Sequence, residues 1–196
     1  MIGLIGLDIG TTGCKTLLFS ADGELIASRA FEYAVDIAQP LWAEQDAEHV
    51  WQLAQQAIRE VVRKSGTLEI KALSLSVQGE AVIPVDALGN ALRPAILGMD
   101  TRTAEQNRWL TERISARALF EKTGMPVHTI NTLPKLIWIA QHEPEIWNKA
   151  NRFLLYEDFI INKMTGDPVI SRCLASRTQL FDLNAGTWSA EILDLI

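Results

Sequence analysis

A short polar stretch near the N-terminus carries the residue types that bind phosphate. It holds one acid, two glycines, two threonines and one base, namely Asp8, Gly10, Thr11, Thr12, Gly13 and Lys15. Glycines let a ligand approach the main chain and permit torsions closed to other residues. Successive backbone N–H groups in such a turn bind an anion, and the hydroxyls and the ammonium group add further donors. We therefore expect Gly10, Thr11, Thr12 and Lys15 to hold the phosphates of a nucleoside triphosphate.

Asp8 stands at the end of an apolar run and is expected to hold a divalent cation. Mg²⁺ prefers oxygen ligands and keeps several of its waters, so we expect a contact through water. The stretch is neither a P-loop, G-x-x-x-x-G-K-[ST], nor a dinucleotide fingerprint, G-x-G-x-x-G before a helix. The alternative is that its glycines only serve a hairpin turn.

The stretch is positioned by three apolar runs of strand length, residues 2–7, 16–19 and 24–28. Asp22-Gly23 separates the second run from the third, and Asp-Gly between such runs is a strong hairpin signal. We predict three consecutive antiparallel strands, with the phosphate-binding residues at the first turn.

A second group of polar residues follows the alternating segment 70–77, which predicts a strand with one buried face. Gln78 and Glu80 come directly after its end, and another strand is predicted over residues 81–85. Ligands in open α/β sheets gather beyond strand ends, so Gln78 and Glu80 are placed to bind substrate. A polar turn is the alternative, because loops are ordinarily polar.

Two further pairs are candidate substrate ligands. Asp100 and Arg102 follow a strand predicted over residues 91–97. They either grip a polyol hydroxyl and a phosphate, or form a cap and a solvated ion pair. Glu157 and Asp158 follow a short apolar run, just before a predicted helix. Capping of that helix is their alternative role, and Asp158 is able to serve both.

Helices are predicted from apolar spacing and from their caps. Asp46 is a good N-cap, Ser115 begins a short helix that ends at Thr123-Gly124, and Thr132 caps a helix with Pro134 near its start. The remaining predictions are a helix over residues 159–164 closed by Gly166, a strand and polar turn over 169–182, and an amphipathic helix over 189–196. The abrupt ending inside a helix suggests part of a longer chain.

Composition limits the class of protein. The 196 residues are 48% hydrophobic and 21% charged, enough for one large or two small ordered domains. A net charge of −6 argues against a nucleic-acid partner. No apolar run reaches membrane-spanning length, and no signal peptide opens the chain. Cys14 and Cys173 lie far apart, as expected of reduced thiols in a cytoplasmic protein.

Several short motifs together resemble the FGGY family of carbohydrate kinases. They run in the family's order from residue 2 to about residue 190, and the later ones look more like its gluconokinase and pentulokinase branch. The motifs are Asp8–Thr12 with Lys15, Ala43–Asp46, Asp100–Ala104, Thr123–His128, Pro134–Trp138 and Ala175–Thr178.

The resemblance implies an actin-like, ribonuclease H-like α/β domain, with a mixed sheet, antiparallel N-terminal hairpins and flanking helices. It implies Mg²⁺- and ATP-dependent transfer of the γ-phosphoryl group to a sugar or polyol hydroxyl. By the same resemblance, residues 1–196 correspond to the N-terminal, sugar-binding domain. The resemblance further implies that the general base, an aspartate, and most of the adenine pocket lie in a C-terminal domain absent from this chain. We therefore expect no catalytic base here and an inactive isolated domain.

Residue by residue, Asp8 looks like the acid beside the metal and the phosphates, and Gly10 to Thr12 look like the γ-phosphate loop. Glu80 matches an acid that binds substrate in glycerol kinases, but Gly79 stands where those enzymes have arginine. Xylulokinases have Gln-Met-His here, so the sugar is left open. Glu157 and Asp158 align with a second substrate-facing acid region.

Two other functions are weighed against a sugar kinase. An actin- or Hsp70-like ATPase shares the hairpin loop, and a non-catalytic regulator would bind sugar without transferring phosphate. The expected partners are a sugar, polyol or aldonate and the protein's own C-terminal domain, with neither nucleic acid nor membrane. The oligomeric state is open, a homodimer being one option.

Overall fold

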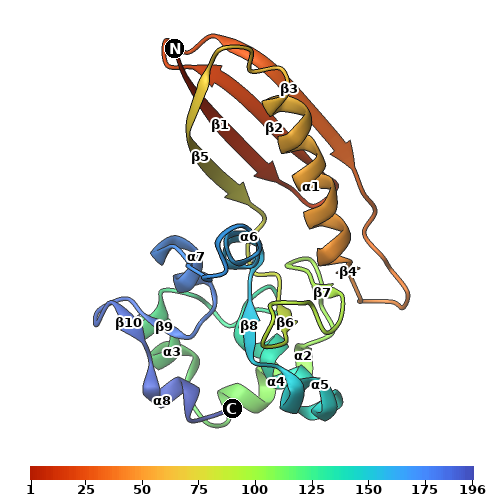
Figure 1. Ribbon diagram of the computed structural model, residues 1–196. Coiled ribbons are helices and arrows are strands. Elements are labelled where there is room, and N and C mark those ends of the chain that lie inside the picture. Colours follow the sequence, from red (N-terminus) through yellow and green to blue (C-terminus); the bar gives the residue numbers. More distant parts are fainter. The chain divides into compact units, whose positions relative to one another are not determined.

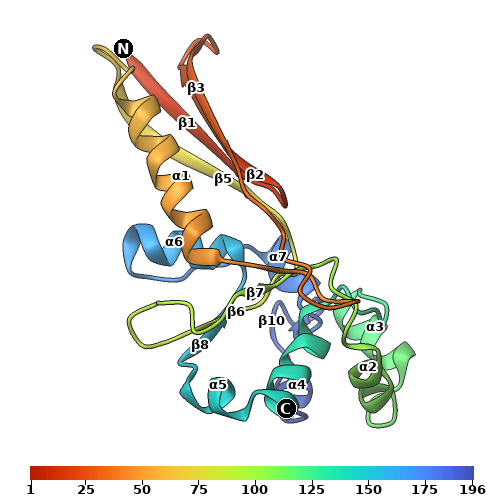
Figure 2. The same cartoon turned by 90° about the vertical axis from the view of Figure 1, so that its right-hand side faces the viewer.

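The computed structural model describes residues 1–196 and divides them into two compact units, which are described separately. The first unit contains residues 1–35 and 46–78, and the second contains residues 36–45 and 79–196. Figures 1 and 2 show the elements of both. None of the helices is long and apolar enough to cross a membrane.

A four-stranded mixed sheet forms the first unit. The strands β1 (Ile2–Ile9), β2 (Gly13–Ser20) and β3 (Leu25–Glu32) are consecutive and antiparallel, as predicted. Strand β5 (Glu69–Val77) pairs in parallel with β1, so the order is β3-β2-β1-β5. The first hairpin turn thereby lies at the end of a central strand, with β5 on its other side.

Helix α1 (Ala47–Val62) connects the antiparallel strands to β5 and lies along the sheet in both views. Its predicted N-cap is confirmed, because the Asp46 side chain accepts a hydrogen bond from the His49 N–H at 3.0 Å. Val61 packs against Ile5 and Leu18 in a core shared with the sheet. The alternating pattern of the strands therefore supplies one buried face for the helix.

The second unit contains three short antiparallel strand pairs and no larger sheet. These are β4 (Glu44–Gln45) with β7 (Ala95–Ile96), β6 (Ile83–Val85) with β8 (Arg152–Leu154), and β9 (Phe181–Asp182) with β10 (Thr187–Trp188). The strands predicted over residues 81–85 and 91–97 are thus much shorter than the apolar runs that suggested them. Apolar character there reflects burial rather than strand length.

Seven helices complete the second unit: α2 (Ala104–Thr111), α3 (Ala116–Thr123), α4 (Thr132–His142), α5 (Pro144–Lys149), α6 (Tyr156–Thr165), α7 (Arg172–Arg177) and α8 (Ala190–Leu193). Helix α4 lies in the core, where every residue from Thr132 to Ile139 is buried. A helix buried on all sides needs no polar face, which makes its one internal cation, Lys135, exceptional.

Three local predictions in the second unit are wrong. Residues 172–177 form helix α7 rather than a strand, because Ser171 caps them by accepting from the Leu174 N–H at 3.2 Å. The N-cap of helix α4 is Asn131 rather than the predicted Thr132, which is the first residue of the helix. Helix α6 begins at Tyr156, so Glu157 and Asp158 lie in its first turn rather than before it.

Candidate functional site

The candidate phosphate loop joins β1 to β2 in the first unit. Asp8 and Lys15 face each other as cross-strand neighbours, and both side chains are exposed. On the other side of β1, the Ser76 hydroxyl donates a hydrogen bond to Asp8 at 3.0 Å. One carboxylate and one ammonium group therefore flank the turn of Gly10, Thr11 and Thr12 on the same accessible face.

The glycines of this loop serve close approach rather than unusual torsions. Neither Gly10 nor Gly13 takes a left-handed backbone conformation, which corrects the expectation for both. A side chain at position 13 would place its Cβ 2.7 Å from the Phe31 carbonyl oxygen on β3. Gly13 is thus required where β2 and β3 meet, and the Gly10 N–H closes the turn on the Gly13 carbonyl at 2.9 Å.

Two side chains donate hydrogen bonds to the Gly10 carbonyl, one from each side of the β1–β2 hairpin. The Tyr33 hydroxyl, just beyond β3, donates to it at 2.9 Å, and the Gln78 amide, just beyond β5, donates at 3.4 Å. Burial raises the pKa of Tyr33, so its hydroxyl keeps the proton that it donates. The sequence places Gln78 among the substrate ligands, a role that stays a prediction, and the structure also brings its side chain to the candidate phosphate loop. Tyr33 is a residue that the sequence reasoning missed.

Glu80 lies in the second unit and is buried, with 5% of its surface exposed. Its carboxylate pairs with Arg177 of α7, and its carbonyl accepts from the Lys135 ammonium group of α4 at 2.9 Å. The strand end predicted to carry a substrate acid therefore carries a glutamate held by Lys135 and Arg177, and its role with substrate stays a prediction. A cation inside the apolar run 133–139 is a sequence signal that points to Lys135.

Asp100 and Arg102 form an ion pair that is buried, not solvated. The Asp100 side chain is fully buried, and its Oδ2 accepts from Arg102 Nη2 at 2.6 Å and from the Ala43 N–H at 2.7 Å. The Arg102 guanidinium lies 3.6 Å from the centre of the Trp42 ring. Both predicted ligands are thus occupied by contacts within the unit, and their role with substrate stays a prediction.

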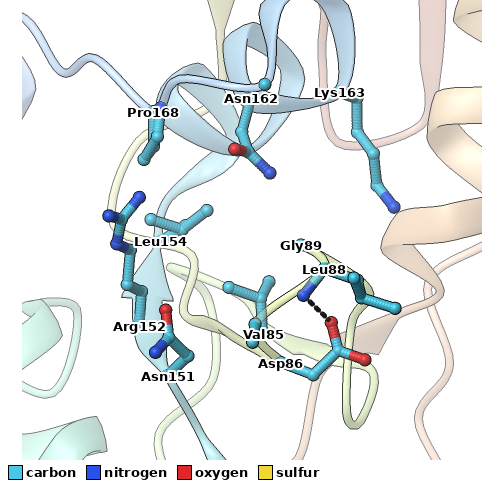
Figure 3. A pocket seen from close by; sticks show the side chains of 12 residues that line it. Val85, Asp86, Leu88, Gly89, Asn151, Arg152, Leu154, Asn162, Lys163 and Pro168 are labelled. Atoms are coloured by element: carbon cyan, nitrogen blue, oxygen red, sulfur yellow. Dashed lines mark hydrogen bonds between the residues drawn. The ribbon is translucent and has the colours of Figure 1, made fainter.

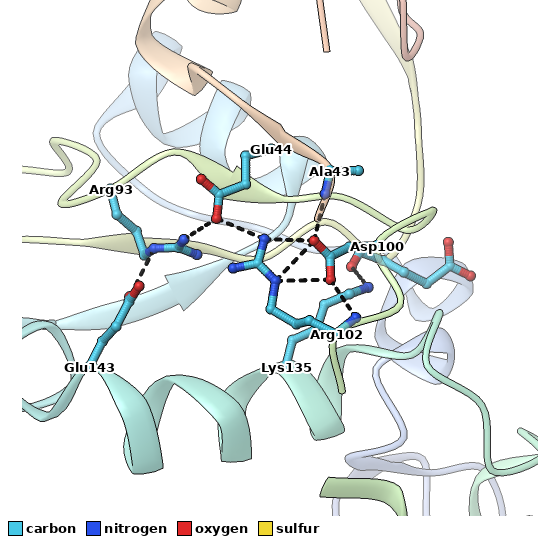
Figure 4. Close-up of polar contacts among 8 residues, drawn as sticks. Ala43, Glu44, Arg93, Asp100, Arg102, Lys135 and Glu143 are labelled. Carbon is cyan, nitrogen blue, oxygen red and sulfur yellow. Dashed lines mark hydrogen bonds and ion pairs between the residues drawn. The ribbon is translucent and has the colours of Figure 1, made fainter. Parts of the chain in front are cut away.

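This pair belongs to a wider network, which Figure 4 shows. Glu44 accepts from Arg102 at 2.8 Å and pairs with Arg93, and Arg93 in turn binds Glu143 at 2.9 Å. Each charge in the network has a partner of opposite sign, but Arg93 Nη1 and Arg102 Nη1 are buried without a hydrogen-bond partner. The network fixes β4 and the segments after β6 and β7 to the end of α4.

Glu157 and Asp158 have different partners. Asp158 caps α6, its carboxylate accepting from the Leu155 N–H at 2.7 Å, and burial raises its pKa to about 7. Glu157 is partly exposed and accepts from the Ser171 N–H, ahead of α7, at 2.7 Å. The capping alternative therefore holds for Asp158, and the substrate role of either acid stays a prediction.

A separate cavity of about 320 Å³ lies in the second unit, beside the 86–90 turn and the C-terminal part of α6. Figure 3 shows the Asn162 carboxamide pointing into it, near Gly89. None of the predicted site residues lines it. No group of three histidine, cysteine or acidic side chains suited to a metal ion occurs in either unit.

Solved structures of similar fold are sugar kinases. The chain matches xylulose kinase from Rhodospirillum rubrum with a TM-score of 0.94 at 28% identity, over 98% of this chain and 40% of that one. It matches gluconate kinase from Lactobacillus acidophilus with a TM-score of 0.92 at 27% identity, over 98% of this chain and 39% of that one. The fold is therefore that of the actin-like ATPase class, as the resemblance implied.

Sequence comparison gives the family. The model of the N-terminal domain of the FGGY family of carbohydrate kinases matches residues 3–196. Xylulose kinase of Escherichia coli (strain K12) is 34% identical over 190 residues, 96% of this chain and 39% of the relative. The chain belongs to the FGGY family of carbohydrate kinases. It spans about two fifths of the length of the curated relatives it matches.

Proposed function

We propose that the protein carrying this chain transfers the γ-phosphoryl group of ATP to a hydroxyl of a sugar, polyol or aldonate. In this proposal residues 1–196 are the N-terminal, sugar-binding domain. The observation that carries it is the hairpin loop of the first unit, whose Gly10 carbonyl is held from two sides and whose flanking charges are exposed.

In the proposal, the loop holds the phosphates of ATP. Gly10, Thr11 and Thr12 supply backbone and hydroxyl donors, and Lys15 supplies a positive charge beside them. A loop built before the ligand arrives needs no reorganisation as charge shifts during transfer. Phosphoryl transfer depends largely on such positioning and electrostatic stabilisation, so this loop is the main contribution of the first unit to the reaction.

Asp8 suits a magnesium ion that keeps most of its waters. It offers one exposed carboxylate, oriented by Ser76 at 3.0 Å and adjacent to the phosphate loop. Mg²⁺ commonly binds through one or two carboxylates together with substrate phosphates, so the lack of a larger acidic cluster fits this metal. When bound, the ion would neutralise charge on the phosphates.

The acids of the second unit would orient the accepting hydroxyl, with Glu80 as the leading candidate and Asp100, Arg102, Glu157 and Asp158 as further ones. The general base belongs to the C-terminal domain that the longer relatives imply. Closure of that domain would exclude water, which otherwise competes as the acceptor. We expect residues 1–196 alone to lack kinase activity.

A thermal-shift screen of the whole protein tests this function. Polyols, ketoses and aldonates are each added with and without a magnesium complex of a non-hydrolysable ATP analogue. A ligand that binds the native state raises the melting temperature by mass action. We expect a shift with one sugar class, followed by ADP release that depends on that sugar.

ADP release that ignores every sugar would contradict the proposal and indicate an ATPase. Sugar binding without any ADP release would indicate a non-catalytic regulator.

The free cysteines, Cys14 and Cys173, agree with the further proposal of a cytoplasmic location.

A further inference from the structure

Glu80 combines a buried carboxylate with an unusual backbone. Its φ is +58°, a left-handed conformation that residues other than glycine rarely adopt. Such a conformation persists only when the surrounding structure holds it, and it concentrates at ligand-binding positions. The question is therefore which groups hold Glu80, and in what orientation they leave its carboxylate.

Lys135 holds the main chain at this position. Its side chain is fully buried, and its ammonium group donates to the Glu80 carbonyl at 2.9 Å and to the Ile130 carbonyl at 2.5 Å. It thereby joins the loop after β5 to the loop before α4. Burial lowers the pKa of Lys135 to about 7, against the attraction of the Glu80 and Asp100 carboxylates. Both the charged and the neutral amine keep enough N–H groups for the two carbonyls.

Arg177 holds the side chain of Glu80. Its Nε and Nη2 both contact the same carboxylate oxygen, Oε1. Neither of these contacts uses the second oxygen, Oε2. It lies beside Gly98, where an added Cβ would be 3.6 Å from Oε2 and 3.6 Å from the Ile130 side chain. The missing side chain of Gly98 thus leaves space at this second oxygen.

We propose that Glu80 Oε2 accepts a hydrogen bond from a hydroxyl of the substrate, and that Lys135 and Arg177 are the residues that position it. Gly98 keeps the space beside this oxygen open. The inference rests on the proposed function, since it assigns atoms to the substrate side of that site. It adds two residues on α4 and α7 that bind no substrate themselves.

A double-mutant cycle in the whole protein tests the link between Lys135 and Glu80. The variants are Lys135→Met, which keeps the length of the side chain but removes its donors, Glu80→Gln, and both together. We expect each single change to raise the KM for the sugar about tenfold or more, and to change the KM for ATP less than about twofold. The double variant should lie within about twofold of Glu80→Gln alone, because coupled residues are not additive. Effects on the sugar KM that multiply would overturn the positioning role of Lys135.

Gly98→Ala keeps the test decisive if Lys135→Met does not fold. Its Cβ would meet neighbours only at 3.4 Å and beyond, an ordinary contact, so the melting temperature should stay unchanged. We expect the sugar KM to rise about fivefold or more while the ATP KM stays constant. Gly6→Ala, with no atom within 4 Å of the new Cβ, is the matched control. An unchanged sugar KM in Gly98→Ala would overturn the role of Oε2.

Failure of the proposed function gives a different result. A wild-type protein that neither binds nor phosphorylates any sugar overturns that function, and this inference with it. A wild-type protein that phosphorylates a sugar, with multiplying effects in the cycle, overturns only the positioning role of Lys135.

Discussion

The first unit carries its site charges on the surface, whereas the second unit buries most of its own. Asp8 and Lys15 are exposed on regular strands of eight residues. Asp100, Lys135 and the Arg102 side chain are almost wholly buried, among strands of two or three residues. A continuous sheet fixes its loop largely through backbone hydrogen bonds, to which Tyr33 and Gln78 add contacts from neutral side chains. A unit without one uses buried side-chain charges to hold its loops, so its charges bear on stability.

The largest expected effect tests this contrast directly. Asp100→Ala removes the acceptor of the Ala43 N–H and leaves the Arg102 guanidinium short of a partner. Breaking a buried ion pair costs ~3–5 kcal/mol, which urea denaturation would measure. Lys71→Ala, which breaks the exposed pair with Glu69 on β5, should cost at most ~1 kcal/mol. Equal losses from both variants would remove the contrast.

Asp158 should make the stability of the second unit depend on pH. Its folded pKa of about 7 lies above its unfolded value of 3.8, so the folded state binds the proton more tightly. The stabilisation is complete below the unfolded pKa and is lost as pH rises through about 7, with a slope of at most ~1.4 kcal/mol per pH unit between the two pKa values. Asp158→Asn keeps an oxygen for the Leu155 N–H and should lose this dependence. Denaturation curves at pH 4, 5.5 and 7 measure this dependence. Parallel plots of unfolding free energy against pH for the wild type and Asp158→Asn would contradict it.

Gly13→Ala should destabilise the first unit, because its Cβ would lie 2.7 Å from the Phe31 carbonyl oxygen. Overpacking of this kind costs ~1–3 kcal/mol. Gly6→Ala on β1 meets nothing within 4 Å and should be neutral or stabilising by up to ~1 kcal/mol. Urea denaturation of the two variants distinguishes the cost of a close contact at position 13 from the general effect of replacing a flexible glycine in a strand. Equal stability of the two would show that the strands adjust easily.

The smallest effect on stability is expected for Tyr33→Phe, which removes one hydrogen bond and costs ~0.5–1.5 kcal/mol. Because the Tyr33 hydroxyl holds the candidate phosphate loop, the proposed function predicts that the KM for ATP rises about fivefold or more in the whole protein. Tyr156→Phe is the matched control, since its hydroxyl binds Gln45 at 2.8 Å in the second unit. It should lose similar stability and keep its ATP KM. A rise in both variants would indicate a general loss of folding.

The same contrast explains which features the sequence predicted. The hairpins around Gly10 and Asp22-Gly23, and the cap at Asp46, depend on residues within a few positions of each other, and the patterns place them correctly. The partners of Asp100 and Glu80 lie far away, at Ala43 and at Lys135 and Arg177. No local pattern encodes such pairings. The sequence alone therefore allows a solvated Asp100–Arg102 pair, although the structure buries it. Helix α7 was missed because its six residues hold too little apolar spacing to separate helix from strand.

The course of the chain has a consequence for synthesis. Residues 36–45 leave the first unit and contribute β4, Ala43 and Glu44 to the second. All elements of the first unit have been translated by residue 78, and domains generally fold as units as the chain emerges. We therefore expect the sheet to form first. Residues 36–45 would then remain a loop until β7 and Arg102, with which β4 and Glu44 pair, have been translated. Neither unit is a single continuous segment, so a cut between residues 78 and 79 would separate β4 from its partner strand.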